Sequence, residues 1–166
     1  MKNLSKERYL HLFETVSAKK NLALSVVWLG RVVTGAVYLY YPLALLWLIL
    51  RKDTLWVPFL AVPAVGFAAV SLLRKALNFK RPYEELSITP LYKKETRGKS
   101  FPSRHVFSAF VIAAVSFRLN FILGAVLTLL GALLAACRVL SGVHYPKDVL
   151  CGAALGLLIG SAVWLF

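Results

Sequence analysis

Long apolar runs alternate with short polar clusters along most of this chain. Four runs, at residues 22–50, 55–73, 121–140 and 149–166, approach or exceed the roughly 20 residues that a helix needs to cross a hydrocarbon core. A fifth run, residues 106–117, reaches that length only if its helix begins near Pro102 and carries Ser103, Arg104 and His105 on its first turn. The pattern predicts an all-α, polytopic transmembrane bundle of about five spans.

The first twenty residues have a different pattern, with apolar positions at three-to-four spacing among charges. Tyr9, Phe13 and Val16 belong to this stripe. Such a segment predicts an amphipathic helix on the membrane surface, and a plain solvated terminus is the alternative. The length gives no reason for a second domain, so residues 1–166 are expected to form one integral membrane unit with residues 1–20 as its interfacial helix.

Three polar clusters interrupt the apolar pattern, at residues 74–82, 102–105 and 138–148. The first ends the second span, the second begins the third, and the third joins the fourth to the fifth. Counting the crossings places all three on the same side of the membrane. Ionisable groups at or inside a bilayer are costly, so we expect these clusters to converge on a functional site.

Composition and charge agree with a membrane protein. The chain is 59% hydrophobic, has a mean hydropathy of +0.70 and carries a net charge of +13. The cations flank apolar runs and no nucleic-acid-binding motif is visible, so anionic lipid headgroups are the expected partners, and nucleic acid is not. Cys137 and Cys151 fall within apolar runs and are interpreted as small buried residues. No ligand spacing typical of a metal site occurs, and no cofactor is expected.

The clusters contain groups suited to phosphate chemistry. Arg74 and Arg81 are about two helical turns apart, and an arginine fork suits bidentate contact with a phosphate. Ser103 stands at a predicted helix start, where free N–H groups favour an anion. His144 and Asp148 are four residues apart, so the carboxylate can fix one ring nitrogen and leave the other free to attack.

The order and spacing of these residues resemble a known family. Arg74-x6-Arg81-Pro82, Pro102-Ser103-Arg104-His105 and Arg138-x5-His144-x3-Asp148 are similar to the three-part signature of the type 2 phosphatidic acid phosphatase family (PAP2), which shares its core with the vanadium haloperoxidases. The motifs span about half of the chain, and the predicted helices resemble those of the small bacterial membrane members.

The resemblance implies a role for each matching residue. His144 would attack phosphorus and form a phosphohistidine, Asp148 would orient it, and His105 would protonate the leaving oxygen. Phosphate oxygens would be bound by Arg81 and Arg138, helped by Ser103 and the backbone N–H of residue 104. Arg74 and Arg104, which depart from the family pattern, are further cationic candidates for binding phosphate. The family implies hydrolysis without a metal.

Three positions depart from the family pattern. Arg74 replaces a lysine, Arg104 replaces a glycine, and Cys137 replaces a common serine. Arg104 would either crowd the anion or contact a larger phosphate group. None of these changes removes the expected nucleophile or a proton-transfer group.

The resulting hypothesis is a phosphatase of a lipid phosphate or diphosphate in the bacterial cytoplasmic membrane. Undecaprenyl diphosphate and phosphatidylglycerol phosphate are the first expected substrates, followed by phosphatidic acid and lipid A. A catalytically impaired lipid-phosphate-binding protein is the alternative, and a haloperoxidase-like oxidant is disfavoured by the spans. The positive-inside rule places the motif face in the cytoplasm, whereas the resemblance implies an extracytoplasmic face, which we expect here. The oligomeric state is not predicted.

Overall fold

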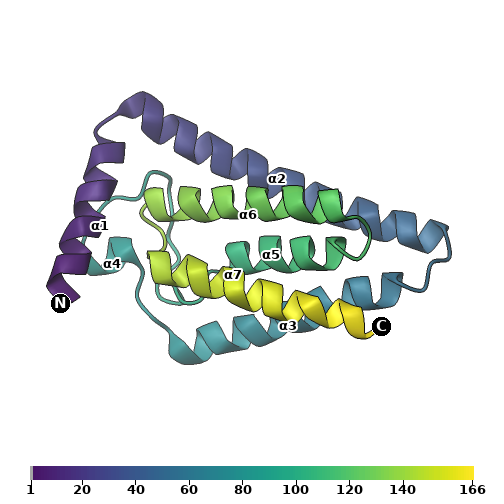
Figure 1. The fold of residues 1–166 in the computed structure, drawn as a ribbon. Coiled ribbons are helices and arrows are strands. Elements are labelled where there is room, and N and C mark those ends of the chain that lie inside the picture. The colour runs from purple at the N-terminus through teal and green to yellow at the C-terminus, as the bar shows by residue number, and fades with distance from the viewer. Residues whose placement is uncertain (1) are drawn as a thin grey trace.

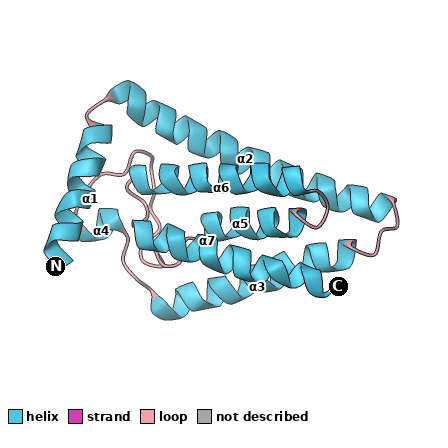
Figure 2. Cartoon of the chain, in the orientation of Figure 1, coloured by secondary structure: helices cyan, strands magenta, loops and turns pink. Residues whose placement is uncertain are grey.

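The computed structural model describes residues 2–166, with side chains from residue 6 onward. Within that range the chain is all helical, which confirms the predicted fold class (Figures 1 and 2). The helices are α1 (Lys2–Ser17), α2 (Lys20–Leu50), α3 (Trp56–Leu77), α4 (Pro82–Glu85), α5 (Arg104–Ser116), α6 (Phe121–Leu140) and α7 (Pro146–Gly160), followed by the 3-10 helix η1 (Ser161–Leu165).

Four segments are long and apolar enough to cross a membrane: Lys20–Leu50, Trp56–Glu85, Phe121–Leu140 and Pro146–Leu165. Large apolar side chains on them are exposed, and Trp28, Leu129 and Leu158 are among the most accessible. In a water-soluble protein this exposed surface would be costly, whereas in a bilayer it contacts lipid tails. The chain is therefore an integral membrane protein.

The fifth apolar run forms a short helix at the centre of the bundle. Helix α5 has 13 residues, and every residue from Val106 to Ser116 is buried. At about 1.5 Å per residue it is roughly 20 Å long, less than the thickness of a hydrocarbon core. Because α5 meets α2, α3, α6 and α7 rather than lipid, it does not need spanning length. It also begins at Arg104 and not at Pro102, so Pro102 and Ser103 precede the helix.

Three glycines on α7 allow this helix to pack closely against α5. A Cβ atom added to Gly156 would lie 2.8 Å from the carbonyl oxygen of Phe107 and 2.9 Å from the backbone nitrogen of Val111. Gly152 and Gly160 face the same helix, so three glycines at four-residue spacing form the contact face of α7. The close approach brings the starts of α5 and α7 together at one end of the bundle.

Helix α1 lies across this end of the bundle (Figure 1). Its apolar stripe differs in part from the prediction, because Tyr9, Phe13 and Val16 are buried against the protein and do not face outward. Leu12 remains 43% exposed on the other side of the helix. The position of α1 on a membrane surface stays a prediction.

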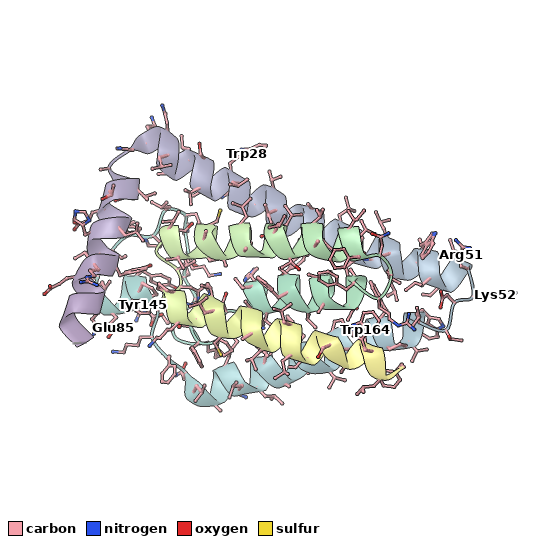
Figure 3. All side chains as sticks on the ribbon, in the orientation of Figure 1. Trp28, Arg51, Lys52, Glu85, Tyr145 and Trp164 are labelled. Atoms are coloured by element: carbon pink, nitrogen blue, oxygen red, sulfur yellow. The ribbon has the colours of Figure 1, made fainter. Side chains whose placement is uncertain are left out.

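The three polar clusters converge as the crossing count predicted. The end of α3, the start of α5 and the turn between α6 and α7 all lie at the α1 end. Arg51 and Lys52 mark the opposite end, while Glu85 and Tyr145 lie beside α1 (Figure 3).

Candidate active site

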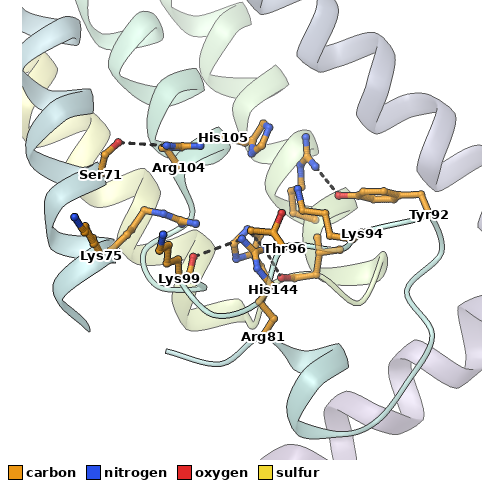
Figure 4. A pocket seen from close by; sticks show the side chains of 13 residues that line it. Ser71, Lys75, Arg81, Tyr92, Lys94, Thr96, Lys99, Arg104, His105 and His144 are labelled. Carbon is orange, nitrogen blue, oxygen red and sulfur yellow. Dashed lines mark hydrogen bonds between the residues drawn. The ribbon is translucent and has the colours of Figure 1, made fainter. Parts of the chain in front are cut away.

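A cavity of about 280 Å³ opens where the clusters meet (Figure 4). All three clusters contribute side chains to its wall, together with the loop after α4. Its lining has seven lysines and arginines and no carboxylate: Arg74, Lys75, Arg81, Lys94, Lys99, Arg104 and Arg138. His105 and His144 also line the cavity, together with the hydroxyl-bearing residues Ser71, Tyr92 and Thr96. A concave surface with this charge favours a multiply charged anion.

His144 lies in the turn between α6 and α7 and is only 3% exposed. Its Nδ1 is 3.4 Å from Oδ2 of Asp148 and 3.4 Å from the hydroxyl oxygen of Ser100. The Ser100 hydroxyl donates to the same carboxylate oxygen at 2.5 Å, and the backbone N–H of Tyr145 donates to it at 3.1 Å. The Asp148 carboxylate and the Ser100 hydroxyl oxygen can both accept a hydrogen bond from Nδ1. They therefore favour a proton on Nδ1, which leaves the Nε2 lone pair unprotonated.

The charge state of His144 follows from its burial. Burial lowers the pKa of His144 to about 4, the hydrogen bond with Asp148 acts in the opposite direction, and the charge of Arg81 lowers the pKa further. The ring is therefore neutral near pH 7 and keeps a free lone pair. A neutral imidazole held at Nδ1 by a carboxylate is the usual arrangement of an oriented nucleophile or base.

Two buried arginines from the first cluster are held by backbone carbonyl groups. Arg81 donates from Nε to Gly98 at 3.1 Å and from Nη1 to Val143 at 3.3 Å, and Nη1 lies 3.5 Å from Nε2 of His144. Arg74 donates through Nη1 to the carbonyl oxygens of Ser100 and Pro102. Both guanidinium groups are thus fixed beside the cavity with little freedom to turn away.

Arg138, near the end of α6, also lines the cavity. Its Nη1 donates to the hydroxyl of Tyr92 at 2.6 Å, and its Nη2 donates to the hydroxyl of Thr34 on α2 at 3.3 Å. The Nε atom is buried and has no partner among the described residues. Each terminal nitrogen of Arg138 has a second N–H beyond these two hydrogen bonds, so the guanidinium keeps donors for an anion.

The start of α5 provides the remaining groups of the second cluster. The first N–H groups of a helix have no intrahelical acceptor, so those at Arg104 and His105 are available to an anion. His105 lines the cavity, and Arg104 lies at its rim with its guanidinium 3.5 Å from the hydroxyl of Ser71 and 5.0 Å from the ring of Phe67 (Figure 4).

Two predicted site residues do not line the cavity. Asp148 lies behind His144, as its expected orienting role requires. Ser103 is the N-cap of α5, but its hydroxyl is fully buried and has no hydrogen-bond partner in the part of the chain described. A contact between that hydroxyl and phosphate stays a prediction. The backbone N–H of Ser103 donates to the carbonyl of Asp148 at 2.8 Å and so joins the second and third clusters.

Several residues of the site carried no signal in the sequence. Ser100 and Tyr92 belong to the loop between α4 and α5, and Thr34 lies within the first apolar run. Lys94 from the same loop lines the cavity, and burial together with the charges of Arg81 and Arg138 lowers its pKa. Across residues 2–166 no group of three or more His, Cys, Asp or Glu side chains is arranged to hold a metal ion.

Comparison with known proteins places the sequence near bacterial membrane phosphatases. The model of the PAP2 superfamily matches residues 55–166. A lipid A 1-phosphatase of Rhizobium etli is 34% identical over 97 residues, which make up 52% of this chain and 39% of that protein. The bacitracin transport permease protein BcrC of Bacillus licheniformis is 31% identical over 106 residues, 61% of this chain and 51% of the relative. The similarity thus spans about half or less of these relatives.

Two solved structures share the fold over nearly the whole chain. The crystal structure of Aquifex aeolicus LpxE has a TM-score of 0.74 and 25% identity, and the match covers 95% of this chain and 94% of LpxE. The transmembrane PAP2 type phosphatidylglycerolphosphate phosphatase of Bacillus subtilis has a TM-score of 0.59 and 23% identity, with 95% and 91% covered. The second likeness is one of fold alone. Both agree with a helical transmembrane architecture.

Proposed function

The chain belongs to the PAP2 superfamily, and we propose that it is a membrane phosphatase that removes the terminal phosphate from a lipid phosphate or diphosphate. One observation carries the proposal: buried His144, with Asp148 behind it, faces a cavity whose wall has seven cations and no carboxylate among the described side chains. Catalysis of phosphoryl transfer depends mainly on positioning and on stabilising charge at the phosphate oxygens. The cavity offers both.

The reaction proceeds in two steps. The Nε2 lone pair of His144 attacks phosphorus, an N–P bond forms, and the P–O bond to the lipid breaks while His105 donates a proton to the leaving oxygen. Burial and the charges of Arg138 and Lys94 lower the pKa of His105 to about 3, so His105 takes this proton from a singly protonated phosphate group as the substrate binds. Arg74, Arg81 and Arg138 stabilise the negative charge on the non-bridging oxygens. A water molecule then attacks the phosphohistidine as His105 takes up its proton, the N–P bond breaks, and inorganic phosphate is released. The scheme uses no metal ion.

An apolar groove beside the cavity supports a lipid substrate. Its volume is about 570 Å³, and its lining includes Leu60 and Phe67 of α3 and Ser108 and Ile112 of α5. The same two helices line the cationic cavity through Ser71 and Arg104, and Arg104 contacts Phe67. An acyl or isoprenoid chain in the groove would place its phosphate among the cations. A soluble phosphate ester has no apolar chain to bind in this groove.

Undecaprenyl diphosphate and phosphatidylglycerol phosphate are the proposed substrates of first choice, and phosphatidic acid and lipid A follow. The name of one relative supports a lipid substrate of this kind, since it is a lipid A 1-phosphatase. The alternative is an impaired binding protein in which Arg74 and Arg104, two departures from the family pattern, block turnover. The Arg104 side chain turns toward Ser71 and Phe67, an arrangement that leaves room for phosphate.

Release of inorganic phosphate from a panel of these four lipids by detergent-solubilised protein tests the function. We expect release from at least one lipid, and His144→Ala abolishes it. His11→Ala is the matched control, because His11 is exposed on α1 and outside the cavity. A binding protein would release no inorganic phosphate from any of the four lipids and would still bind lipid.

We place the active site on the extracytoplasmic face, as in the small bacterial members that the sequence resembles. Arg74, Arg81 and Arg138 are engaged within the site, so they contribute less to the charge bias that the positive-inside rule counts. A variant lacking both cysteines, with cysteine introduced at Lys93 or Lys52, tests the orientation. A membrane-impermeant maleimide applied to intact cells labels the Lys93 variant if the site faces outward. Labelling of the Lys52 variant instead would place the site in the cytoplasm.

A further inference from the structure

We propose that α1 positions the turn that carries His144, and that Tyr9 and Phe13 are the residues through which it acts. The inference rests on the proposed function of His144 as the nucleophile. Both residues precede residue 55, where the match to the family begins, so the PAP2 signature gives no account of them. The support comes from contacts between α1 and residues 141–145.

Tyr9 contacts the backbone on both sides of the turn. It is 5% exposed, and its hydroxyl lies 3.1 Å from the carbonyl oxygen of Val139 and 3.4 Å from that of His144. The Tyr9 ring also packs against the ring of Tyr145, with 5.0 Å between centroids. One side chain from α1 therefore contacts the end of α6 at Val139, the backbone of the proposed nucleophile and the residue after it.

Phe13 supports the same turn one helical turn further along α1. Gly142 has a φ of +79°, and a Cβ atom there would lie 2.8 Å from Cε2 of the Phe13 ring. Glycine is thus required at this position both for its conformation and for the approach of the ring. Phe13 is 6% exposed, so this contact is part of the packed core and not a surface contact.

A second connection runs from α1 to the turn through α4. Lys6 contacts Glu85 at 2.5 Å, and Glu85 accepts a hydrogen bond from the hydroxyl of Tyr145 at 2.9 Å. Figure 3 shows Glu85 and Tyr145 side by side at the α1 end. The ion pair is partly exposed and contributes little energy by itself. The hydrogen bond with Glu85 holds Tyr145, whose backbone N–H donates to Asp148, the partner of His144.

The turn is otherwise held by few groups. Leu91 donates its N–H to the carbonyl of Ser141 at 3.1 Å, and Arg81 donates to that of Val143 at 3.3 Å. Tyr9 supplies the corresponding contact to His144. Because the attacking atom must lie within a fraction of an ångström of its productive position, loss of this contact should reduce turnover more than substrate binding.

The test compares Tyr9→Phe with Tyr40→Phe. Tyr40 is a matched control, since its hydroxyl also makes one partly buried hydrogen bond, at 3.0 Å to Ser116, but at a distance from the cavity lining. With dioleoyl phosphatidic acid and undecaprenyl diphosphate as probes, we expect Tyr9→Phe to lower kcat about tenfold while KM changes less than about twofold. Tyr40→Phe should leave both unchanged at a similar loss of thermal stability. Phe13→Leu should also lower kcat with little change in KM. This second variant keeps the test valid if Tyr9→Phe fails to fold.

Amide hydrogen exchange gives a readout that does not depend on activity. In Tyr9→Phe the peptide that includes residues 141–145 should exchange faster than in wild type, while peptides from α3 and α6 keep their protection. If wild type releases no phosphate from any lipid, the proposed function fails, and the exchange data still decide whether α1 holds the turn. Unchanged exchange at the turn in both Tyr9→Phe and Phe13→Leu, or loss of kcat equal to that of Tyr40→Phe, overturns the inference.

Discussion

The hydroxyl of Ser100 lies 2.5 Å from Oδ2 of Asp148, and both side chains are almost fully buried. Asp148 is thereby fixed by a residue 48 positions earlier in the chain, in addition to its own helix. The same hydroxyl lies 3.4 Å from Nδ1 of His144. Ser100 thus helps to hold the carboxylate and the imidazole together behind the cavity.

Replacing Ser100 by alanine should lower kcat about 10- to 100-fold, because a hydrogen bond to a charged group contributes about 1.5–3 kcal/mol. KM should change little, since Ser100 does not line the cavity. Steady-state phosphate release measures both constants. Ser161→Ala is the control, as that hydroxyl donates only to the carbonyl of Leu158, three residues earlier. Wild-type kcat in Ser100→Ala would show that Asp148 needs no support from the loop.

The protonation of His144 gives a second prediction. Because burial lowers its pKa from the ordinary 6.5 to about 4, the ring should stay neutral as the pH falls from 7 to about 5 and gain a proton only near pH 4. Ring signals of ¹⁵N-labelled histidine, assigned by their loss in His144→Gln, report this directly in the absence of substrate. A midpoint near 6.5 would mean that the ring is more exposed to water than its 3% accessibility implies.

Arg104 should affect the choice of substrate more than the chemistry. Its guanidinium lies against Ser71 and Phe67 at the junction of the cationic cavity and the apolar groove. We expect Arg104→Gly to keep turnover on lipid monophosphates within about tenfold, and to change the ratio of kcat/KM between diphosphate and monophosphate lipids. Arg51→Gly, at the opposite end of the bundle, should leave that ratio unchanged. Complete inactivation of Arg104→Gly would instead assign Arg104 an essential role.

The parts of the site whose positions follow from helical periodicity could be predicted from the sequence. The apolar runs give the crossings, the crossings give the common face, and four-residue spacing places Asp148 beside His144. Arg138 falls at the end of a span on the common face, as the crossing count requires. These features depend on local periodicity and on the thickness of a bilayer, and both can be read from a single chain. The prediction that one helix end carries both Arg74 and Arg81 is wrong, because α3 ends at Leu77 and Arg81 lies in extended backbone before α4.

The residues that support the site could not be predicted in this way. Thr34 is 104 residues from Arg138, and an isolated threonine in an apolar run is typical of any helix. Ser100 lies in a loop without periodicity. Tyr9 and Phe13 have helical spacing, but an apolar stripe faces lipid and protein alike, so their direction depends on tertiary packing. The central position of α5 likewise depends on its neighbours.

The packing of α5 against α7 gives a prediction about stability. Gly156→Ala should destabilise the protein by about 1–3 kcal/mol, since the added methyl group would meet backbone atoms of α5 that cannot move alone. Gly35→Ala is the matched control, because a Cβ there meets nothing within 4 Å, and we expect a change between zero and about 1 kcal/mol in favour of the folded state. Thermal unfolding in one detergent compares the two. Equal midpoints would show that α5 and α7 are not in close contact.

Covalent trapping of the enzyme during turnover tests the central claim most directly. Protein mixed with a ³²P-labelled lipid phosphate and quenched in alkali within milliseconds should carry label that is stable to base and labile to acid, and mass spectrometry should locate it on His144. Asp148→Ala should slow formation of the label, and His144→Ala should abolish it. Label on another residue, or full turnover with no covalent phosphate in a quench that captures a known phosphohistidine, would contradict the account.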